Sequence, residues 1–145
     1  MRIHGYDPVK VLPMREALTQ IGFEELLSPQ DVDRAFSVAE GTMLLVVNSV
    51  CGCAAGSARP GLRQALERGP RPDRLATVFA GMELEAVERA RSHFAGYEPS
   101  SPQMGLFRDG KLVFMLERKD IEGRSADEIA TDLTRVFADH CAPAS

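Results

Sequence analysis

The sequence has no tryptophan, only three cysteines in 145 residues and no long apolar run. A membrane-spanning helix needs about 18 or more consecutive apolar residues, so none is expected here. Three cysteines are too few, and odd in number, for the disulfide scaffold of a small secreted domain. The first residues lack the apolar segment of a signal peptide, which argues against export. We therefore expect a cytoplasmic protein whose cysteines are reactive thiols.

Charge of one sign is also not in large excess. The chain has 17 Lys and Arg against 21 Asp and Glu, a formal net charge of −4, and the two signs are interspersed. Electrostatic binding of nucleic acid or of an anionic membrane needs a basic patch, so neither is expected as a partner. The length suits one domain, residues 1–145, and a hydrophobic content of 44% is ordinary for a folded protein.

Turn and cap signals divide the chain into alternating helices and strands. Ser28-Pro29-Gln30-Asp31 is typical of a helix start, and Ser125 with Glu128 forms a capping box. Asp109-Gly110 between two apolar runs predicts a hairpin. Helices are expected over 8–21, 28–41, 53–68, 84–94 and 125–141. Strands are expected over 23–27, 42–48, 75–80, 104–107 and 112–116.

This order of elements predicts the fold class. Strands joined through a helix run parallel, whereas the two hairpin strands run antiparallel. The sheet is therefore mixed, and helices cover both of its faces. The order is that of a thioredoxin-like α/β fold, a three-layer domain with a two-cysteine turn after its second strand.

Side-chain spacing assigns the helix faces. In the first helix Leu12, Leu18 and Ile21 are expected to face the core, with Pro13 in the first turn or at a kink. The second helix is expected to carry Ala39 on its apolar face, and Pro60 to bend the third. The charged residues of 83–91 are interpreted as a solvated helix face.

The segment that follows the strand at 42–48 contains the pair Cys51-Gly52-Cys53 and then small residues that can start a helix. The first amide groups of a helix have no intrahelical partner, and the helix dipole adds partial positive charge there. A cysteine at this position titrates at roughly 3.5–7.5, compared with about 8.5 for a free thiol. A disulfide across one residue would close a very short loop, so it would stabilise the fold little and would suit a bond that opens and closes.

Two other interpretations of the pair stay open. The cysteines could be small buried hydrophobes, or they could bind a metal with Cys141 and His140, although zinc-binding pairs are usually spaced by two to four residues. For redox chemistry Cys51 is the expected nucleophile and Cys53 the resolving cysteine. Arg59 is about two helical turns away, roughly 10 Å along the axis, which leaves the helix N-terminus as the main activator.

Seven segments together resemble the bacilliredoxins, bacterial thioredoxin-like proteins with a Cys-Gly-Cys site. The resemblance extends over nearly the whole chain, and the run Cys51-Gly52-Cys53-Ala54-Ala55-Gly56 is its most specific part. The segments are Pro13-Met14-Arg15, Gly22-Phe23-Glu24-Glu25-Leu26, Val47 to Gly56, Ala58-Arg59-Pro60, Val78-Phe79-Ala80-Gly81, Pro99-Ser100-Ser101-Pro102 and Ile121-Glu122-Gly123.

The resemblance implies a thiol–disulfide oxidoreductase. Cys51 would attack a mixed disulfide between a client protein and bacillithiol, with Cys53 as resolving residue, and a general assay would register disulfide reductase or isomerase activity. Gly52, Ser101 and Pro102 would contact the substrate. Proline bonds are cis in only about 5–6% of cases, but the resemblance implies a cis bond before Pro102.

The same resemblance implies oxidised or S-thiolated client proteins as partners, with the low-molecular-weight thiol as co-substrate and no bound cofactor or metal. Cys141 is expected to be a semi-buried residue at a helix end and not a resolving cysteine. The alternative function is a non-enzymatic thiol- or metal-binding module.

Overall fold

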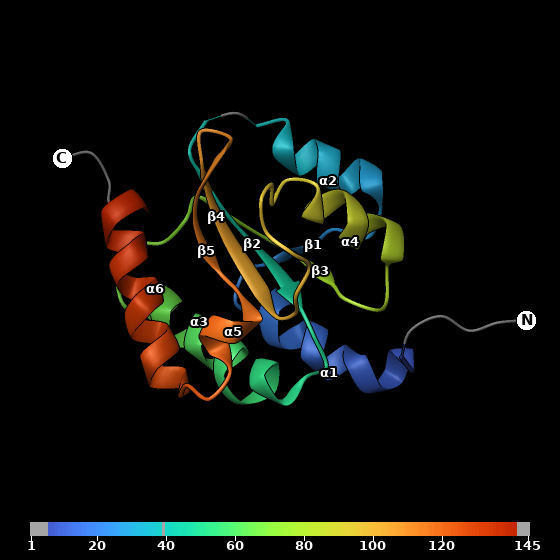
Figure 1. Ribbon diagram of the computed structural model, residues 1–145, viewed down its shortest axis with the longest axis horizontal. Helices are drawn as coiled ribbons and strands as arrows, with labels where there is room; N and C mark the ends of the chain where they lie inside the picture. Colours follow the sequence, from blue (N-terminus) through green and yellow to red (C-terminus); the bar gives the residue numbers. More distant parts are fainter. Residues whose placement is uncertain (1–5, 39, 142–145) are drawn as a thin grey trace, which may run out of the picture.

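A computed structural model describes residues 6–38 and 40–141 (Figure 1). Ala39, expected on the apolar face of the second helix, lies outside this part of the chain. The strands are β1 (Glu24–Glu25), β2 (Thr42–Asn48), β3 (Arg74–Phe79), β4 (Gln103–Arg108) and β5 (Lys111–Leu116). The helices are α1 (Pro8–Thr19), α2 (Pro29–Phe36), the π-helical turn η1 (Ala54–Ala58), α3 (Arg59–Glu67), α4 (Leu84–Arg91), α5 (Arg118–Ile121) and α6 (Ala126–Cys141).

Within the described residues the strands form a five-stranded sheet in the order β1-β3-β2-β4-β5. β3 runs parallel to both β1 and β2, whereas β4 runs antiparallel to β2 and to β5. The predicted mixed sheet of an α/β fold is therefore confirmed. The predicted strand at 42–48 matches β2, and the predicted hairpin matches β4 and β5.

Helices cover both faces of the sheet, as predicted (Figure 1). On one face Leu44 and Val46 of β2 pack in a core with residues of α1, α3 and α6. On the other face Leu45 and Val47 pack in a second core with residues of α2 and α4. Every side chain of β2 is buried, which explains its nearly continuous apolar sequence. The strand that leads to the cysteine pair is therefore held from both sides.

The face assigned to α1 was partly wrong. Leu12 is 51% exposed, whereas Val11 and Leu18 are 1% and 0% exposed. Val11 and Leu18 are seven positions apart and share a helix face, and Leu12 is turned away from it by about 100°. α1 begins at Pro8, after the cap Asp7, so that Pro13 lies inside the helix instead of in its first turn.

Two helices end earlier than predicted. α2 ends at Phe36 and not near Gly41, and α4 ends at Arg91 and not at Phe94. The short helix α5 was not predicted at all. The predicted helix starts were more accurate. The Ser28 hydroxyl accepts from the amide of Asp31 at the start of α2, and Ser125 and Glu128 form the predicted capping box before α6.

The helix after the cysteine pair is not uniform. A helical turn begins at Gly52, continues as η1 and becomes α3 at Arg59. Pro60 cannot donate to the carbonyl four residues earlier, and its ring would collide with that carbonyl in a regular α-helix. The wider π-turn immediately before it avoids this conflict, as π-turns do at other irregular helix positions. The bend predicted at Pro60 is thus a widened turn.

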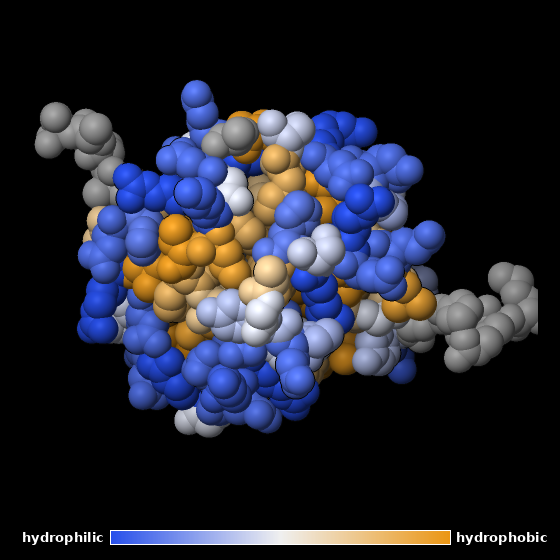
Figure 2. Space-filling view, turned by 45° about the horizontal axis from the view of Figure 1, so that its top comes forward, coloured by the Kyte–Doolittle hydropathy of each residue, from blue (hydrophilic) through white to orange (hydrophobic). Residues whose placement is uncertain are grey.

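In the part of the chain that the structure describes, no helix is both long enough and apolar enough to cross a membrane. Figure 2 shows a largely hydrophilic face with apolar residues exposed in several places, one of them a patch on the side where β5 and α6 lie in Figure 1. β5 is an edge strand, and its Val113 is 38% exposed.

The contact between α3 and α6 gives a first prediction. A Cβ on Gly61 would lie 2.9 Å from side-chain atoms of Ile129 and 3.1 Å from the carbonyl of Ala126. Gly61→Ala is expected to lower the free energy of unfolding by about 1–3 kcal/mol through overpacking. Urea unfolding measures this free energy.

Gly56→Ala is the matched control, because no atom from another part of the structure would lie within 4 Å of its Cβ. It should unfold at or above the urea concentration at which the wild type unfolds. Equal stability of the wild type and Gly61→Ala would contradict the close packing.

Candidate redox site

The turn between β2 and the following helix is fixed by side-chain hydrogen bonds. The side-chain oxygen of Asn48 accepts from the backbone amide of Ser49 at 2.9 Å, and the side-chain nitrogen of Asn48 donates to the Met14 carbonyl at 3.1 Å. The Ser49 hydroxyl accepts from the amide of Cys51 at 3.1 Å. Asn48 and Ser49 are both buried, so that these bonds are shielded from water. The position of Cys51 relative to the sheet is thereby set.

Cys51 occupies the cap position of the helical turn. Its carbonyl accepts from the amides of Ala54 and Ala55, at 3.0 and 3.2 Å. Its Sγ accepts from the amide of Cys53 at 3.3 Å, as the side chain of an N-cap residue does. The two Sγ atoms lie 2.6 Å apart, and both cysteines are free and partly exposed. The structure therefore brings both thiols to a helix N-terminus, as the sequence predicted.

The two thiols differ in acidity. Burial raises the pKa of Cys51, but hydrogen bonds from the Cys53 thiol and from the amides of Cys53 and Ala54, with the charge of Arg118, outweigh it and lower the pKa overall. For Cys53, burial, the hydrogen bond to Cys51 and the negative charge of Cys51 raise the pKa to about 11. A negative charge on one sulfur makes a second one costly. A negative charge is therefore more favourable on Cys51 than on Cys53.

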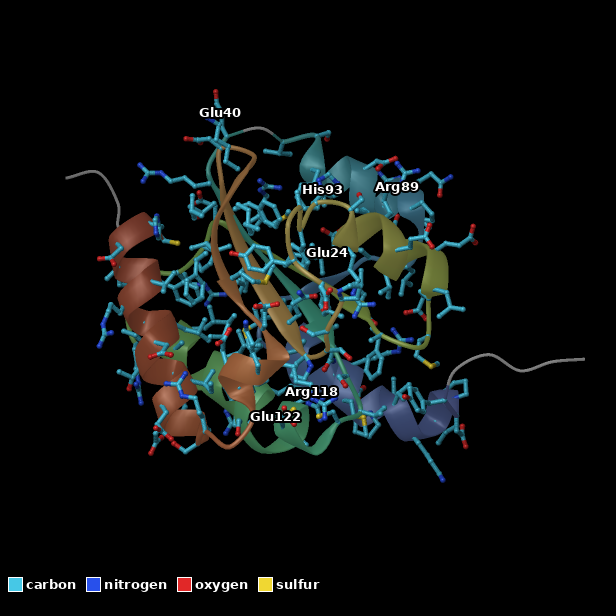
Figure 3. The ribbon with its side chains drawn as sticks, viewed as in Figure 1. Glu24, Glu40, Arg89, His93, Arg118 and Glu122 are labelled. Carbon is cyan, nitrogen blue, oxygen red and sulfur yellow. The ribbon has the colours of Figure 1, made fainter. Side chains whose placement is uncertain are left out.

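Arg118 is the contributor that the sequence analysis missed. It begins α5, whose cap is formed by Glu117 and Asp120, and its Nε lies 3.4 Å from a Glu122 carboxylate oxygen. Figure 3 shows Arg118 and Glu122 in the space between α5 and the turn that follows β2. The pKa of Arg118 is raised chiefly by the charge of Cys51 and then by Glu122. The spacing Glu-x-x-Asp at 117–120 was the one local signal for this helix.

Arg59 also lies closer to the cysteine pair than the sequence analysis predicted. Its Nη1 donates to the Asn48 side-chain oxygen at 2.9 Å and to the Ser49 carbonyl at 2.7 Å. The estimate of roughly 10 Å counted rise along the helix axis only. A helical side chain points back toward the helix N-terminus, and an arginine is long enough to reach the preceding turn. Arg59 thus holds the turn from which Cys51 projects.

The loop before β4 lies beside the same turn. Val47 of β2 pairs with Gln103, so Ser101 and Pro102 come next to the end of β2. The Ser101–Pro102 peptide bond is cis, which confirms the expectation from the family resemblance. Pro102 is buried and Ser101 is partly exposed, whereas Gly52 is exposed between the two cysteines.

Two charged residues of the predicted solvated face have structural contacts instead. Arg91 is partly buried, and its Nη2 donates to the Ser100 carbonyl at 2.8 Å, which holds the loop before β4. Glu83 accepts from Arg15 at 2.7 Å across to α1. Spacing along one helix could not show these partners, because they come from distant parts of the chain.

Cys141 lies at the opposite end of the central strand from the cysteine pair. It is in contact with Thr42, the first residue of β2, whereas Cys51 follows the last residue of that strand. Burial raises the pKa of the Cys141 thiol. Neither Cys141 nor His140 can therefore complete a metal site with Cys51 and Cys53. Residues 6–38 and 40–141 contain no group of three or more metal-binding side chains.

The chain is similar to known sequences over most of its length. The model of a family described as disulphide isomerase matches residues 6–141. A bacilliredoxin of Koribacter versatilis is 52% identical over 136 residues, covering 94% of each chain. A bacilliredoxin of Salinibacter ruber is 56% identical and covers 94% of this chain and 81% of its own. A bacilliredoxin of Bacillus licheniformis is 49% identical and covers 90% of this chain and 92% of its own.

Solved structures support the fold. An oxidoreductase with a thioredoxin fold superposes with a TM-score of 0.58 at 16% identity, covering 78% of this chain and 94% of its own. A thioredoxin mutant from Halobacterium salinarum superposes with a TM-score of 0.57 at 13% identity, covering 86% and 96%. The thioredoxin-like fold expected from the order of elements is therefore confirmed.

The charge of Arg118 gives the second prediction. In Arg118→Gln the Cys51 thiolate loses a nearby positive charge, so the pKa of Cys51 is expected to rise and alkylation to need a higher pH. The rate of iodoacetamide labelling at Cys51, followed by mass spectrometry between pH 5 and pH 10, measures this. Lys119→Gln removes the same charge from the next residue, which pairs with Glu117 at 3.5 Å. An equal displacement of the pH profile in both variants would contradict a specific role for Arg118.

Proposed function

Because this chain belongs to the bacilliredoxin family of thiol–disulfide oxidoreductases, we propose that it reduces mixed disulfides between client proteins and a low-molecular-weight thiol of the bacillithiol type. One observation carries the proposal: two thiols whose sulfurs lie 2.6 Å apart have pKa shifts of opposite sign, lowered at Cys51 and raised to about 11 at Cys53. In such a pair one thiolate can attack a disulfide, and the other thiol stays protonated until it resolves the intermediate. We place the reaction in the cytoplasm, where thiols are kept reduced.

The first step is attack by the Cys51 thiolate on the sulfur of the small thiol in the mixed disulfide. A bond forms between Cys51 Sγ and that sulfur, and the bond to the client sulfur breaks. The client cysteine leaves as a thiolate and takes a proton from water. The amide of Cys53, 3.3 Å from Cys51 Sγ, would stabilise the attacking anion before the step.

The second step is attack by Cys53 on Cys51 Sγ. It forms the Cys51–Cys53 disulfide and releases the small thiol as a thiolate. Once Cys51 is bound to the small thiol it carries no negative charge, and two of the causes that raise the pKa of Cys53 disappear. Cys53 would therefore lose its proton more readily in the intermediate than in the free protein. The disulfide would then be reduced by thiol–disulfide exchange with a second thiol or with a dithiol reductant.

Substrate contacts are proposed at Gly52, Ser101 and Pro102. Gly52 is exposed between the sulfurs and presents no side chain that would obstruct an approaching disulfide. In the described part of the chain, neither the amide nor the carbonyl of Ser101 has a hydrogen-bond partner. These two groups could pair with an extended client segment, as the edge of a sheet does. An accessible pair of this kind would also reduce or isomerise other disulfides.

Cysteine variants test the proposal. After incubation with the oxidised small thiol, intact-mass measurement of the wild type should find a transient adduct followed by the Cys51–Cys53 disulfide, and Cys51→Ser should form neither. Cys53→Ala should retain the adduct, because the displacing thiol is missing, and should release the small thiol at least tenfold more slowly. Cys141→Ala is the control and should behave as the wild type. Release from Cys53→Ala at the wild-type rate would show that Cys53 is not the resolving cysteine.

The alternative of a non-enzymatic thiol- or metal-binding module makes a different forecast in the same assay. It expects no adduct on Cys51 and bound metal by native mass spectrometry. That combination would contradict the oxidoreductase proposal as a whole, because a cysteine that forms no mixed disulfide cannot begin the first step.

A further inference from the structure

Arg59 is buried without an acidic partner. Its side chain is only 9% exposed, and within residues 6–38 and 40–141 no carboxylate forms an ion pair with it. Buried arginines are almost always paired, because taking a charge out of water is costly. Burial lowers the pKa of Arg59, and the Cys51 charge opposes that effect. The guanidinium is therefore poised to accept an anion.

The same guanidinium borders a groove between α1 and α3. The groove has a volume of about 530 Å³ and is lined by Glu16, Gln20, Ala55, Arg59 and Arg63 among others. Nη1 of Arg59 is used by Asn48 and Ser49, whereas its Nε and Nη2 donate to no atom of the described residues. These two nitrogens therefore keep free donors, and Arg59 is one of the residues that line the groove.

One wall of the groove is formed by residues of the helical turn that follows the cysteine pair. Arg59 bonds to the carbonyl of Ser49, which is two residues and at most about 7 Å of chain from Cys51. On the other side Ala55 belongs to the turn that begins immediately after Cys53. A molecule joined through sulfur to Cys51 could therefore extend into the groove.

A second groove beside the pair is less suited to an anion. It has a volume of about 620 Å³ and lies between the 96–100 loop and α5, with Arg118 and Lys119 in its lining. Both of these cations already pair with neighbouring carboxylates, Glu122 and Glu117. In the α1–α3 groove, by contrast, two arginines face a single acid, Glu16, and none of the three has an ion-pair partner in the described residues.

We propose that the α1–α3 groove binds the carboxylate-bearing part of the low-molecular-weight thiol, with Arg59 and Arg63 as its cationic contacts. The inference rests on the proposed function and names the recognition element for that thiol. The client protein would then approach from the side where Ser101 and the second groove lie. Because two arginines and one glutamate give the groove a net positive charge, it should bind anionic small thiols in preference to neutral ones.

The test compares two substrates whose small thiols differ in charge, with methyl esters to keep the difference in size small. A single-cysteine peptide is S-thiolated with glutathione or with glutathione whose two carboxylates are esterified. Arg63→Gln and Arg59→Gln are expected to lower kcat/KM for the glutathione substrate about three- to tenfold more than for the ester, as loss of one nearby charge would. Glu16→Gln should raise the preference for glutathione. Arg135→Gln removes one exposed charge from α6 as the matched control and should leave the preference unchanged.

Two kinetic outcomes would overturn the inference. Equal losses for both substrates in Arg59→Gln and Arg63→Gln would mean that these residues only position the turn or stabilise the fold. No selective loss in Arg63→Gln, which lies on the exposed rim, together with no gain in Glu16→Gln would mean that the groove does not sense the carboxylates.

A binding measurement separates this inference from the proposed function. S-methylglutathione has no thiol and cannot react, so amide chemical-shift titration reports occupancy of the groove without chemistry. Shifts confined to the neighbourhood of Ala55, Arg59 and Arg63, weakened in Arg63→Gln, support the groove even if the wild type proves inactive on every mixed disulfide. Absence of shifts there, in a protein that does form the Cys51 adduct, would overturn the groove and leave the proposed function standing.

Discussion

The chemistry of this protein depends on the cost of holding a negative charge on one partly buried sulfur. That sulfur, on Cys51, accepts hydrogen bonds from the amide and the thiol of Cys53. Arg118 adds a positive charge from another part of the chain. Burial alone would favour the neutral thiol. Because the same contacts raise the pKa of Cys53, the two adjacent thiols acquire different properties from one arrangement. In the proposed reaction the nucleophile and the resolving cysteine would thus be distinguished by position and not by residue type.

The fold supplies the rigidity that this arrangement needs. β2 is buried on both faces and pairs with β3 and β4 along its length. At its end Asn48 and Ser49 form hydrogen bonds with the Met14 carbonyl of α1, with the backbone amides of Ser49 and Cys51, and with Arg59. The loop before β4 is held by Arg91 through Ser100. Three segments that are distant in sequence therefore meet at the carboxyl end of the central strand, where α/β folds commonly bind ligands.

Local signals in the sequence predicted most of the fold and the identity of the cysteine pair. The apolar run at 42–48, the caps at Ser28 and Ser125 and the Asp109-Gly110 turn each act over a few residues, and each prediction was confirmed. Helix ends, the exposure of Leu12 and the roles of Arg59 and Arg118 were missed or wrong. All of these depend on contacts between distant segments or on where a long side chain reaches, and neither is encoded in local spacing. The cis bond before Pro102 was expected only through family resemblance.

The most direct test of the account is a titration of both thiols in the wild-type protein by NMR, with the cysteine Cβ atoms labelled with ¹³C. The account predicts that the Cys51 signal titrates below the pH at which a free cysteine titrates, and that the Cys53 signal moves only near pH 11. Cys141 serves as an internal reference for a buried thiol of raised pKa. If Cys53 titrates before Cys51, or if both titrate together at the pH of a free cysteine, the donors around Cys51 do not stabilise its thiolate and the account is wrong.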